Sequence, residues 1–349
     1  MVKYYTRACN FYFGKTSKEK VRKKLSIPLH GNKLISFDTV EILSRKNKRK
    51  ININKIDSLP GKIRKKIHFD LKQISKKKKF KNLNFSNLPL LMGVLNLTPD
   101  SFSDGGKFTK KNLAEKHSKK LIKDGCDILD IGGEATNPGS KDVDPKNEWK
   151  RIFPTLNKIK KLKKFISLDT RKSFVMENGI KNKINLINDV SGLEYDPSTI
   201  RVLKKTNISF VIHHMQGEPS TMQKNPKYKN VLLDIYDFFE EKLKYLRSEG
   251  IMHNNIILDP GIGFGKKLKH NITLLRNISI FHSLGFPVML GTSRKRFIKD
   301  LSGVNDSKQR LGGTIASSLI AIMQGVQILR VHDVNEVKQS IKVFKSLKF

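Results

Sequence analysis

The chain has 349 residues, of which 38% are hydrophobic, so it can bury a large core as one big domain or as two smaller ones. Its formal net charge of +38 first suggests nucleic-acid binding. Only 14 of the 69 basic residues are Arg, however, and no RNA-recognition, zinc-finger or aromatic-interleaved basic motif is present. We therefore expect no nucleic acid as the main partner and interpret the Lys excess as compositional bias.

The two cysteines, Cys9 and Cys126, supply neither a disulfide framework nor a metal-binding spacing. No apolar run approaches the roughly 20 residues that span a bilayer, and the N-terminus lacks the apolar core of a signal peptide. Residues 1–35 are basic and poor in acids, a composition that transit peptides share. These features favour a cytoplasmic location and no membrane partner.

Charge divides the chain near residue 90. Residues 1–90 hold 25 Lys or Arg against five acidic residues, with basic runs at 46–50, 62–66 and 76–79. We expect a basic N-terminal extension over residues 1–88, partly ordered and flexible near 72–88, followed by one domain over 89–349. The sequence assigns no role to the extension; a tether to nucleic acid or to a membrane surface is an alternative to a solvated extension.

From about residue 90 short apolar runs alternate with amphipathic helical patterns, as in buried parallel strands connected by helices. Eight such units in about 260 residues match a (β/α)8 TIM barrel of the α/β class. A doubly wound open sheet would more often show fewer strands and a Gly-rich dinucleotide turn. The expected strands are 91–96, 127–132, 165–169, 184–188, 208–213, 255–259, 287–291 and 327–331, and the expected helices are 110–124, 151–162, 231–249, 310–325 and 335–347.

Every expected strand ends in hydrogen-bonding or charged side chains, and in a TIM barrel these ends meet at the catalytic face. After the first strand, residues 92–106 (MGVLNLTPDSFSDGG) pass into a long polar loop. The adjacent pair His213 and His214 does not suit zinc, since neighbouring strand residues point to opposite faces. The groups expected at the common site are Asn96, Glu134, Thr136, Asn137, Asp169, Thr170, Arg171, Asn188, Asp189, His213, Asp259, Ser293, Lys295, Arg330 and His332.

These groups divide by chemistry. Two carboxylates, an amide and an amine suit a small planar heterocycle with adjacent donors and acceptors, namely Asp169, Asn188, Asp259 and Lys295. The alternative is that Asp169 and Asp259 only cap the following helices. A second set suits a phosphate or diphosphate, with the Asn96 carbonyl as a Mg²⁺ ligand: Asn96, Thr136, Arg330 and His332.

The motifs taken together resemble those of dihydropteroate synthase over residues 90–349. They are LNLTPDSFSDGG (95–106), DIGGEATNPG (130–139), LDT (168–170), INDVSG (187–192), HHMQGEPSTMQ (213–223), DPGIGFGK (259–266), GTSRK (291–295) and RVHDV (330–334). The resemblance implies a Mg²⁺-dependent homodimeric transferase of folate biosynthesis. It would condense 6-hydroxymethyl-7,8-dihydropterin diphosphate with 4-aminobenzoate to give 7,8-dihydropteroate and diphosphate.

The resemblance also implies roles for individual residues. The pterin would bind Asp169, Asn188, Asp259 and Lys295, and the diphosphate would bind Thr136, Arg330 and His332, with Asn96 on the metal. Phe102, Thr136, Phe264 and Ser293 would hold 4-aminobenzoate. Asp169, Lys295 and Asn96 would be the catalytic groups, and the loop from Thr98 to Gly106 would close over the bound substrates.

One departure stands in the second loop. Ala135-Thr136-Asn137 occupies the place where the family commonly has Ser-Thr-Arg, so a cation near the diphosphate and 4-aminobenzoate is missing. Either 4-aminobenzoate binds more weakly, or Lys141 or Arg171 replaces the cation.

Two other functions are alternatives to this resemblance. A corrinoid-linked, pterin-dependent methyltransferase shares the barrel but would lack both the NLTPDSFSDGG loop and the pair Arg330 and His332. A non-enzymatic barrel carrying a nucleic-acid-binding extension is the second rival.

Overall fold

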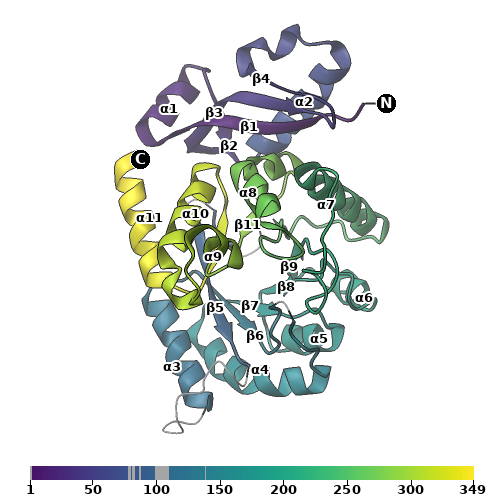
Figure 1. Cartoon of the computed structure of the whole chain (residues 1–349), viewed down its shortest axis with the longest axis vertical. Coiled ribbons are helices and arrows are strands. Elements are labelled where there is room, and N and C mark those ends of the chain that lie inside the picture. The colour runs from purple at the N-terminus through teal and green to yellow at the C-terminus, as the bar shows by residue number, and fades with distance from the viewer. Residues whose placement is uncertain (1, 78–79, 81–82, 86–87, 99–109, 138) are drawn as a thin grey trace.

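The computed structural model describes residues 2–77, 80, 83–85, 88–98, 110–137 and 139–349, with backbone only for 110–112. Figure 1 shows two parts of the molecule. One is a barrel of strands surrounded by helices, and the other is a smaller N-terminal sheet with its own helices, which lies at one end of the barrel. Within the described part of the chain, no helix is both long and apolar enough to cross a membrane.

An eight-stranded parallel sheet forms the barrel and confirms the expected TIM-barrel class. Its hydrogen-bonded order runs β10-β9-β8-β7-β6-β5-β12-β11, and a bridge between Leu258 and Val288 brings its two ends together. The strand expected over 287–291 is reduced to two residues. The strands are β5 (Leu90–Asn96), β6 (Ile128–Gly132), β7 (Phe165–Asp169), β8 (Leu186–Asp189), β9 (Ser209–His213), β10 (Ile256–Asp259), β11 (Met289–Leu290) and β12 (Ile328–Val331).

Helices cover the outside of the barrel and include the five that were expected (Figure 1). The helix expected over 151–162 begins earlier, because Asp144 caps it by accepting from the amides of Lys146 and Asn147. The helices are α3 (Lys110–Lys123), α4 (Pro145–Ile159), η3 (Lys160–Leu162), α5 (Ser173–Lys181), α6 (Thr199–Lys204), α7 (Val231–Ser248), α8 (Leu268–Arg276), η4 (Ile278–Leu284), α9 (Arg296–Ser302), η5 (Ser307–Gln309), α10 (Leu311–Met323) and α11 (Val334–Lys348).

Alternation along the strands separates a dry end of the barrel from a polar end. At the amino ends of the strands, an apolar cluster contains Met92, Ile128, Leu186, Val211, Ile257 and Ile328, with Phe80, Leu83 and Phe85 packed against it. Side chains two residues further along a strand point to the same face. The residues two positions after five members of the cluster are polar, and they lie at the carboxyl ends of the strands: Asp130, Asn188, His213, Asp259 and Arg330.

The N-terminal residues form an ordered unit, which goes beyond the partial order expected for them. The long strand β3 is antiparallel to β1, to β2 and to β4. Residues 72–75 belong to a helix, so the flexibility expected for them is wrong. The elements are β1 (Tyr5–Phe13), α1 (Gly14–Arg22), β2 (Ile27–Leu29), β3 (Asn32–Leu43), β4 (Lys48–Asn52), η1 (Ile53–Ser58) and α2 (Gly61–Ser75).

An apolar core of its own holds this N-terminal unit together. Phe37, Val40 and Ile42 of β3 belong to it. Helix α2 adds residues at spacings of three and four, which place them on one helix face: Ile67, Leu71 and Ile74. The same 15-residue helix carries four lysines and one arginine, which is why the segment first suggests a charged extension.

The N-terminal unit packs on the barrel through η4 and α7. The Ser279 hydroxyl donates to the Ala8 carbonyl at 2.8 Å, and His30 Nε2 lies 3.1 Å from His282 Nδ1. Ion pairs on the outside of α7 add to this junction: Lys3 with Asp237 and Glu240, and Arg45 with Asp234 and Asp237.

Aromatic residues from the two ends of the sequence also meet at this junction. Phe13 contacts Phe344 and Phe349, with ring centroids 5.9 and 5.7 Å away. Gly14 follows with a φ of +57°, and a Cβ there would lie 2.0 Å from the Phe349 carbonyl oxygen. The close approach therefore requires glycine at position 14.

Candidate functional site

A cavity of about 580 Å³ opens at the carboxyl ends of the barrel strands. Its volume suits a ligand of two small ring systems. All of the described site residues from the sequence prediction that were assigned to a substrate or metal line it. The lining includes Asn96, Thr136, Asp169, Asn188, Asp259, Phe264, Ser293, Lys295, Arg330 and His332. Phe102 and the proposed closing loop from residue 99 onward lie outside the described residues.

Strand register places residues predicted to bind the heterocycle on neighbouring strands. Asp169 pairs with Asn188 across β7 and β8, and Asp259 pairs with His213 across β10 and β9. His213 lines the cavity, whereas His214 contacts Lys266 on the other side of the backbone, as the alternation rule predicts.

Arg330 lies at the floor of the cavity between two carboxylates. Its Nε is 2.6 Å from Asp130 Oδ2 and its Nη2 is 2.6 Å from Asp169 Oδ2. The Asn188 amide donates to Asp130 Oδ2 at 3.2 Å. Asp130 therefore links two predicted residues, Arg330 and Asn188, and sequence reasoning missed it. The signal was present, because Asp130 is an acidic residue inside the apolar strand β6.

Polar atoms in this floor remain available for a ligand. Asp169 Oδ1 and Asn188 Oδ1 belong to cavity-lining residues, are buried and accept no hydrogen bond from the described residues. Burying such atoms without a partner costs free energy, so they indicate a site that a ligand with N–H donors completes. Burial raises the pKa of Asp169, and Arg330 opposes that shift.

Lys295 and Asp259 face the same space from the other side. Burial lowers the pKa of Lys295 to about 7, with the nearby Arg330 charge acting in the same direction. Burial raises the pKa of Asp259 to about 6, against a hydrogen bond from the Gly261 amide. The Lys295 ammonium lies 3.9 Å from the centroid of the Phe264 ring. Both groups thus titrate near neutral pH, which is typical of functional sites.

Capping of the next helix does not explain either aspartate. Helix α5 begins after Lys172 and α8 begins after Lys267, and neither N-cap position is an aspartate. Asp169 instead contacts Arg330, and Asp259 Oδ1 accepts from the Gly261 amide at 2.8 Å. The helix-cap alternative is therefore wrong for both.

His332 is a neutral group at the cavity rim. Burial, together with the charges of Arg330 and Arg294, lowers its pKa to about 3. Its Nδ1 lies 3.0 Å from the Ser293 hydroxyl. His332 can therefore offer a phosphate an N–H but no positive charge, which leaves the positive charge to the lining cations Arg294, Lys295, Arg310 and Arg330.

Asn96 is exposed to the cavity at the end of β5. Among the described residues no group of three or more His, Cys, Asp or Glu side chains could hold a metal ion. One amide carbonyl still fits Mg²⁺, which commonly takes one or two protein oxygens and completes its shell with water and substrate phosphates.

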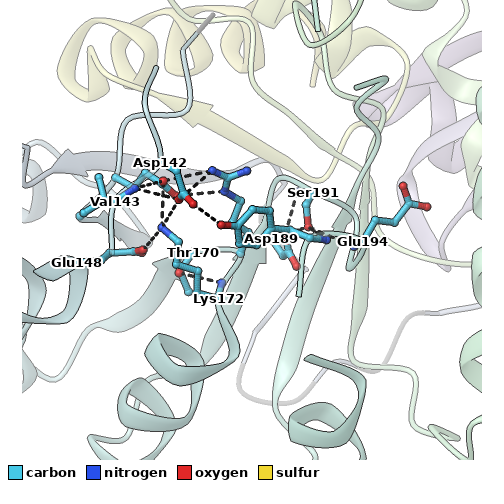
Figure 2. Close-up of polar contacts among 12 residues, drawn as sticks. Asp142, Val143, Glu148, Thr170, Lys172, Asp189, Ser191 and Glu194 are labelled. Atoms are coloured by element: carbon cyan, nitrogen blue, oxygen red, sulfur yellow. Dashed lines mark hydrogen bonds and ion pairs between the residues drawn. The ribbon is translucent and has the colours of Figure 1, made fainter. Parts of the chain in front are cut away.

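A charged network lies behind the second loop, outside the cavity. Figure 2 shows Lys172 pointing toward Asp142 and Glu148; its Nζ is 3.0 and 2.9 Å from their carboxylates. On the far side, Asp189 Oδ1 accepts from the amide and the hydroxyl of Ser191 at 2.8 and 2.6 Å (Figure 2). The Lys172 contacts connect the loops that follow β6 and β7, and the Asp189 contacts lie within the loop that follows β8.

Neither residue predicted to replace the missing cation of the second loop, Lys141 or Arg171, lines the cavity. The cations among the described lining residues are Arg294, Lys295, Arg310 and Arg330. Lys141 is exposed, and Arg171 is buried against Glu134. Arg171 therefore acts at a distance from the cavity or not at all.

Lys266, the last residue of the DPGIGFGK motif, was given no role from the sequence. Its Nζ donates to the carbonyls of Phe264 and His214 at 2.8 and 3.2 Å and lies 3.0 Å from His214 Nδ1. The loops after β9 and β10 are joined in this way. Two of the three partners are backbone carbonyls, which leave no mark in a sequence.

Comparison with known proteins agrees with this geometry. The sequence profile of the family described as "Pterin binding enzyme" matches residues 92–332. The chain belongs to this family. A dihydropteroate synthase of Neisseria meningitidis serogroup B is 40% identical over 264 residues, covering 74% of this chain and 93% of that protein. The dihydropteroate synthase of Escherichia coli K12 is 39% identical, covering 74% and 91%.

Solved structures of pterin-binding enzymes share the fold as well. The dihydropteroate synthase of Yersinia pestis, solved with a sulfonamide drug, superimposes with a TM-score of 0.72 at 36% identity and covers 77% of this chain and 98% of that one. The Xanthomonas albilineans enzyme in complex with 7,8-dihydropteroate gives 0.69 at 32% identity, with coverages of 76% and 95%. The family match begins at residue 92, so the N-terminal unit lies outside it.

Proposed function

We propose that the chain is a dihydropteroate synthase that joins 6-hydroxymethyl-7,8-dihydropterin diphosphate to 4-aminobenzoate. The observation that carries the proposal is the set of unfilled polar atoms at the cavity floor, beside a lysine and an arginine. A pterin ring presents adjacent N–H donors on one edge and acceptors on the other, which is the complement of this set.

In the proposed complex the pterin lies at the cavity floor. Asp259 and Asp169 accept its N–H groups, Asn188 pairs with its lactam edge, and Lys295 donates to a ring carbonyl or nitrogen. Arg330 is held between Asp130 and Asp169, so its charge lies beside the pterin as well as beside the leaving group.

The diphosphate then extends toward the rim. Arg330 supplies positive charge there, while His332 and Thr136 supply neutral hydrogen-bond donors. Asn96 would hold Mg²⁺ through its carbonyl, and the bound ion would neutralise the charge that builds up on the departing diphosphate.

The reaction exchanges one bond at the pterin methylene. The C–O bond to diphosphate breaks, diphosphate leaves with the electron pair, and the amine nitrogen of 4-aminobenzoate forms a C–N bond and releases a proton to water. Positive charge develops on the pterin beside Asp169. A positive charge at that place favours the ionised carboxylate, which in turn stabilises the transition state.

The proposed position of 4-aminobenzoate is between Phe264 and Ser293, beside Thr136. The Phe264 ring is already fixed by His213, whose ring centroid is 4.5 Å away, and by the backbone contact from Lys266. The arylamine is neutral at pH 7 and requires no strong base. Phe102 remains a predicted contact.

A coupled assay of diphosphate release tests the proposal. The full chain is incubated with both substrates and Mg²⁺, and with each substrate alone. We expect diphosphate release only with both substrates and Mg²⁺, together with a pteroate product of matching amount. No release with the complete mixture contradicts the proposal. Methyl transfer to a corrinoid would support the rival enzyme.

The assembly is proposed to be a homodimer in the cytoplasm. Helices α10 and α11 lie side by side (Figure 1) and expose large apolar side chains, namely Ile320, Met323, Val343 and Leu347. Such a patch is typical of a protein interface. Sedimentation of the wild-type chain and of Ile320→Glu tests this: a dimer that becomes a monomer is expected, and a monomeric wild type contradicts it.

A further inference from the structure

The charged network behind the second loop joins three loops of the barrel rim. Loop two, defined as residues 133–144, contributes Glu134 and Asp142. The loop after β7 contributes Arg171 and Lys172, and the loop after β8 contributes Tyr195. Figure 2 shows Asp142 and Lys172 facing one another where these loops meet.

Arg171 makes the geometrically most demanding contacts of this network. Its Nε and Nη2 each lie 3.2 Å from one carboxylate oxygen of Glu134, and Nη2 is also 3.3 Å from Asp142 Oδ1. The guanidinium carbon stacks 3.9 Å from the centroid of the Tyr195 ring. A planar fork is needed to satisfy a carboxylate and stack on a ring at once, and a lysine cannot do both.

Burial separates the two carboxylates that Arg171 holds. The Glu134 side chain is 3% exposed, whereas that of Asp142 is 55% exposed. Asp142 nevertheless accepts from the Tyr195 hydroxyl and contacts both Arg171 and Lys172. Single exposed ion pairs stabilise little, but here three groups hold one carboxylate and fix its place.

Loop two is thereby attached on both sides of its cavity-lining segment. Glu134 lies before Thr136 and Asn137, and Asp142 lies after them. The Val143 amide donates to Glu134 Oε1 at 3.0 Å, which closes the loop on itself. Glu134, Ala135, Thr136 and Asn137 line the cavity, whereas Arg171 stands behind them.

We propose that Arg171 is a positioning residue for 4-aminobenzoate, which it serves by holding loop two through Glu134 and Asp142 without contacting the substrate. The inference rests on the proposed function. It assigns Arg171 an indirect role in place of the direct cation considered for the second loop. Lys172 supports the same carboxylates and also neutralises Glu148 at 2.9 Å, so it maintains the fold of the network when Arg171 is changed.

Steady-state kinetics of Arg171→Met in the full chain test the inference. We expect the KM for 4-aminobenzoate to rise about tenfold, since loop two loses its fork contact, an effect of about 1.4 kcal/mol. The KM for the pterin diphosphate should rise less, by no more than about threefold, because only Thr136 of its proposed contacts lies in loop two, whereas Asp169, Asn188 and Asp259 do not. An unchanged KM for 4-aminobenzoate overturns the proposal.

A double-mutant cycle with Asp142→Asn separates positioning from direct contact. If Arg171 acts through loop two, Asp142→Asn alone raises the KM for 4-aminobenzoate about threefold, and adding it to Arg171→Met changes little more. Full additivity, or no effect of Asp142→Asn, indicates that Arg171 meets the substrate itself and contradicts the proposal.

Two further arginine and lysine variants serve as matched controls. Arg201→Met removes an exposed arginine of α6 and should leave both KM values unchanged. Lys141→Met removes the exposed lysine of loop two; a rise of KM in this variant but not in Arg171→Met would assign the missing cation to Lys141 and overturn the inference. Arg171→Lys, which retains the charge, should fall between wild type and Arg171→Met and replaces the latter if that variant does not fold.

Hydrogen exchange on the ligand-free protein gives a readout that does not need activity. We expect the amides of residues 139–144 to exchange about tenfold faster in Arg171→Met than in wild type, because the Val143 contact opens more often. Equal exchange rates overturn the inference. If wild type releases no diphosphate, the proposed function fails, while this measurement still decides whether Arg171 holds loop two.

Discussion

Two buried aspartates, one in each part of the molecule, differ in how many of their carboxylate oxygens have a partner. In the N-terminal unit, Asp70 has both oxygens occupied, by the Thr6 hydroxyl at 2.7 Å and by the Lys66 ammonium at 2.6 Å. In the barrel, Asp169 has one oxygen on Arg330 and the other without a partner among the described residues. Burial raises the pKa of both carboxyl groups.

The contrast distinguishes groups that stabilise the fold from groups whose hydrogen bonds are completed only when a ligand binds. A satisfied buried carboxylate contributes to stability, and removing it leaves its partners unpaired. A half-satisfied carboxylate costs stability until a ligand completes it. Substitutions should therefore affect stability in the N-terminal unit and activity in the barrel.

The largest effect is expected from Asp169→Asn. The kcat/KM for the pterin diphosphate should fall about 100-fold, since the amide cannot stabilise positive charge on the pterin, a loss of about 2.7 kcal/mol. The free energy of unfolding should change by less than about 1 kcal/mol, because Arg330 keeps Asp130 as its partner. Diphosphate release and urea unfolding measure the two quantities. Wild-type activity in this variant would contradict the catalytic role proposed for Asp169.

Asp70→Ala is the counterpart in the N-terminal unit. It should lower the free energy of unfolding by about 2 kcal/mol, because the Thr6 hydroxyl and Lys66 lose their buried partner. Its kcat/KM should stay within about twofold of wild type at a temperature where both are folded. Asp57→Ala, at an exposed aspartate of the same unit, is the control and should change neither quantity.

The pH dependence of kcat/KM sharpens the comparison within the cavity. Asp259, with a pKa of about 6, must be a carboxylate to accept N–H groups, so activity falls as the pH drops through that value. Lys295, with a pKa of about 7, must be charged to donate, so activity falls as the pH rises through that value. Each limb should change kcat/KM about tenfold per pH unit.

Variants assign the two limbs of that profile. Asp259→Asn should weaken the acid limb, to which Asp169 with its raised pKa also contributes. Lys295→Arg should remove the alkaline limb because arginine stays charged. A limb that survives in its variant belongs to the substrate or to another group. A flat wild-type profile between pH 5 and 8 would contradict the proposed roles of both residues.

The smallest effect concerns the junction between the two parts. Ser279→Ala should lower the free energy of unfolding by about 1 kcal/mol, because the Ala8 carbonyl loses a buried hydrogen bond. A single transition that shifts as a whole shows that the two parts unfold together. Ser58→Ala removes an exposed hydroxyl of the N-terminal unit and should shift the transition by no more than about 0.5 kcal/mol. Two separate transitions would show that the junction does not couple them.

The catalytic face was predictable because its signal is local. Each strand is a short apolar run and each functional group stands at its end, as with Asp169 after Ile166-Ser167-Leu168. A parallel barrel then brings all such ends together without further information. The short strand β11 and the helices α5, α6 and α8 were less visible, because few residues carry their periodicity.

Contacts between distant residues could not be predicted in the same way. The pairing of Arg330 with Asp130 spans 200 residues, and the sequence around either residue does not indicate its partner. Alternation alone could have flagged Asp130, which shares the inward face with Ile128. The N-terminal unit was hidden differently: the apolar spacing of Ile67, Leu71 and Ile74 was present, but lysines dominated its composition.

The aromatic contact between Phe13 and Phe349 has a consequence for synthesis on the ribosome. Phe349 is added 336 residues after Phe13, yet it packs against the core of the N-terminal unit. That unit therefore leaves the exit tunnel with part of its apolar surface uncovered and stays so while the barrel is being translated. The surface is covered only when α11 has emerged, so a chaperone that recognises exposed aromatic groups would bind the N-terminal unit throughout translation of the barrel.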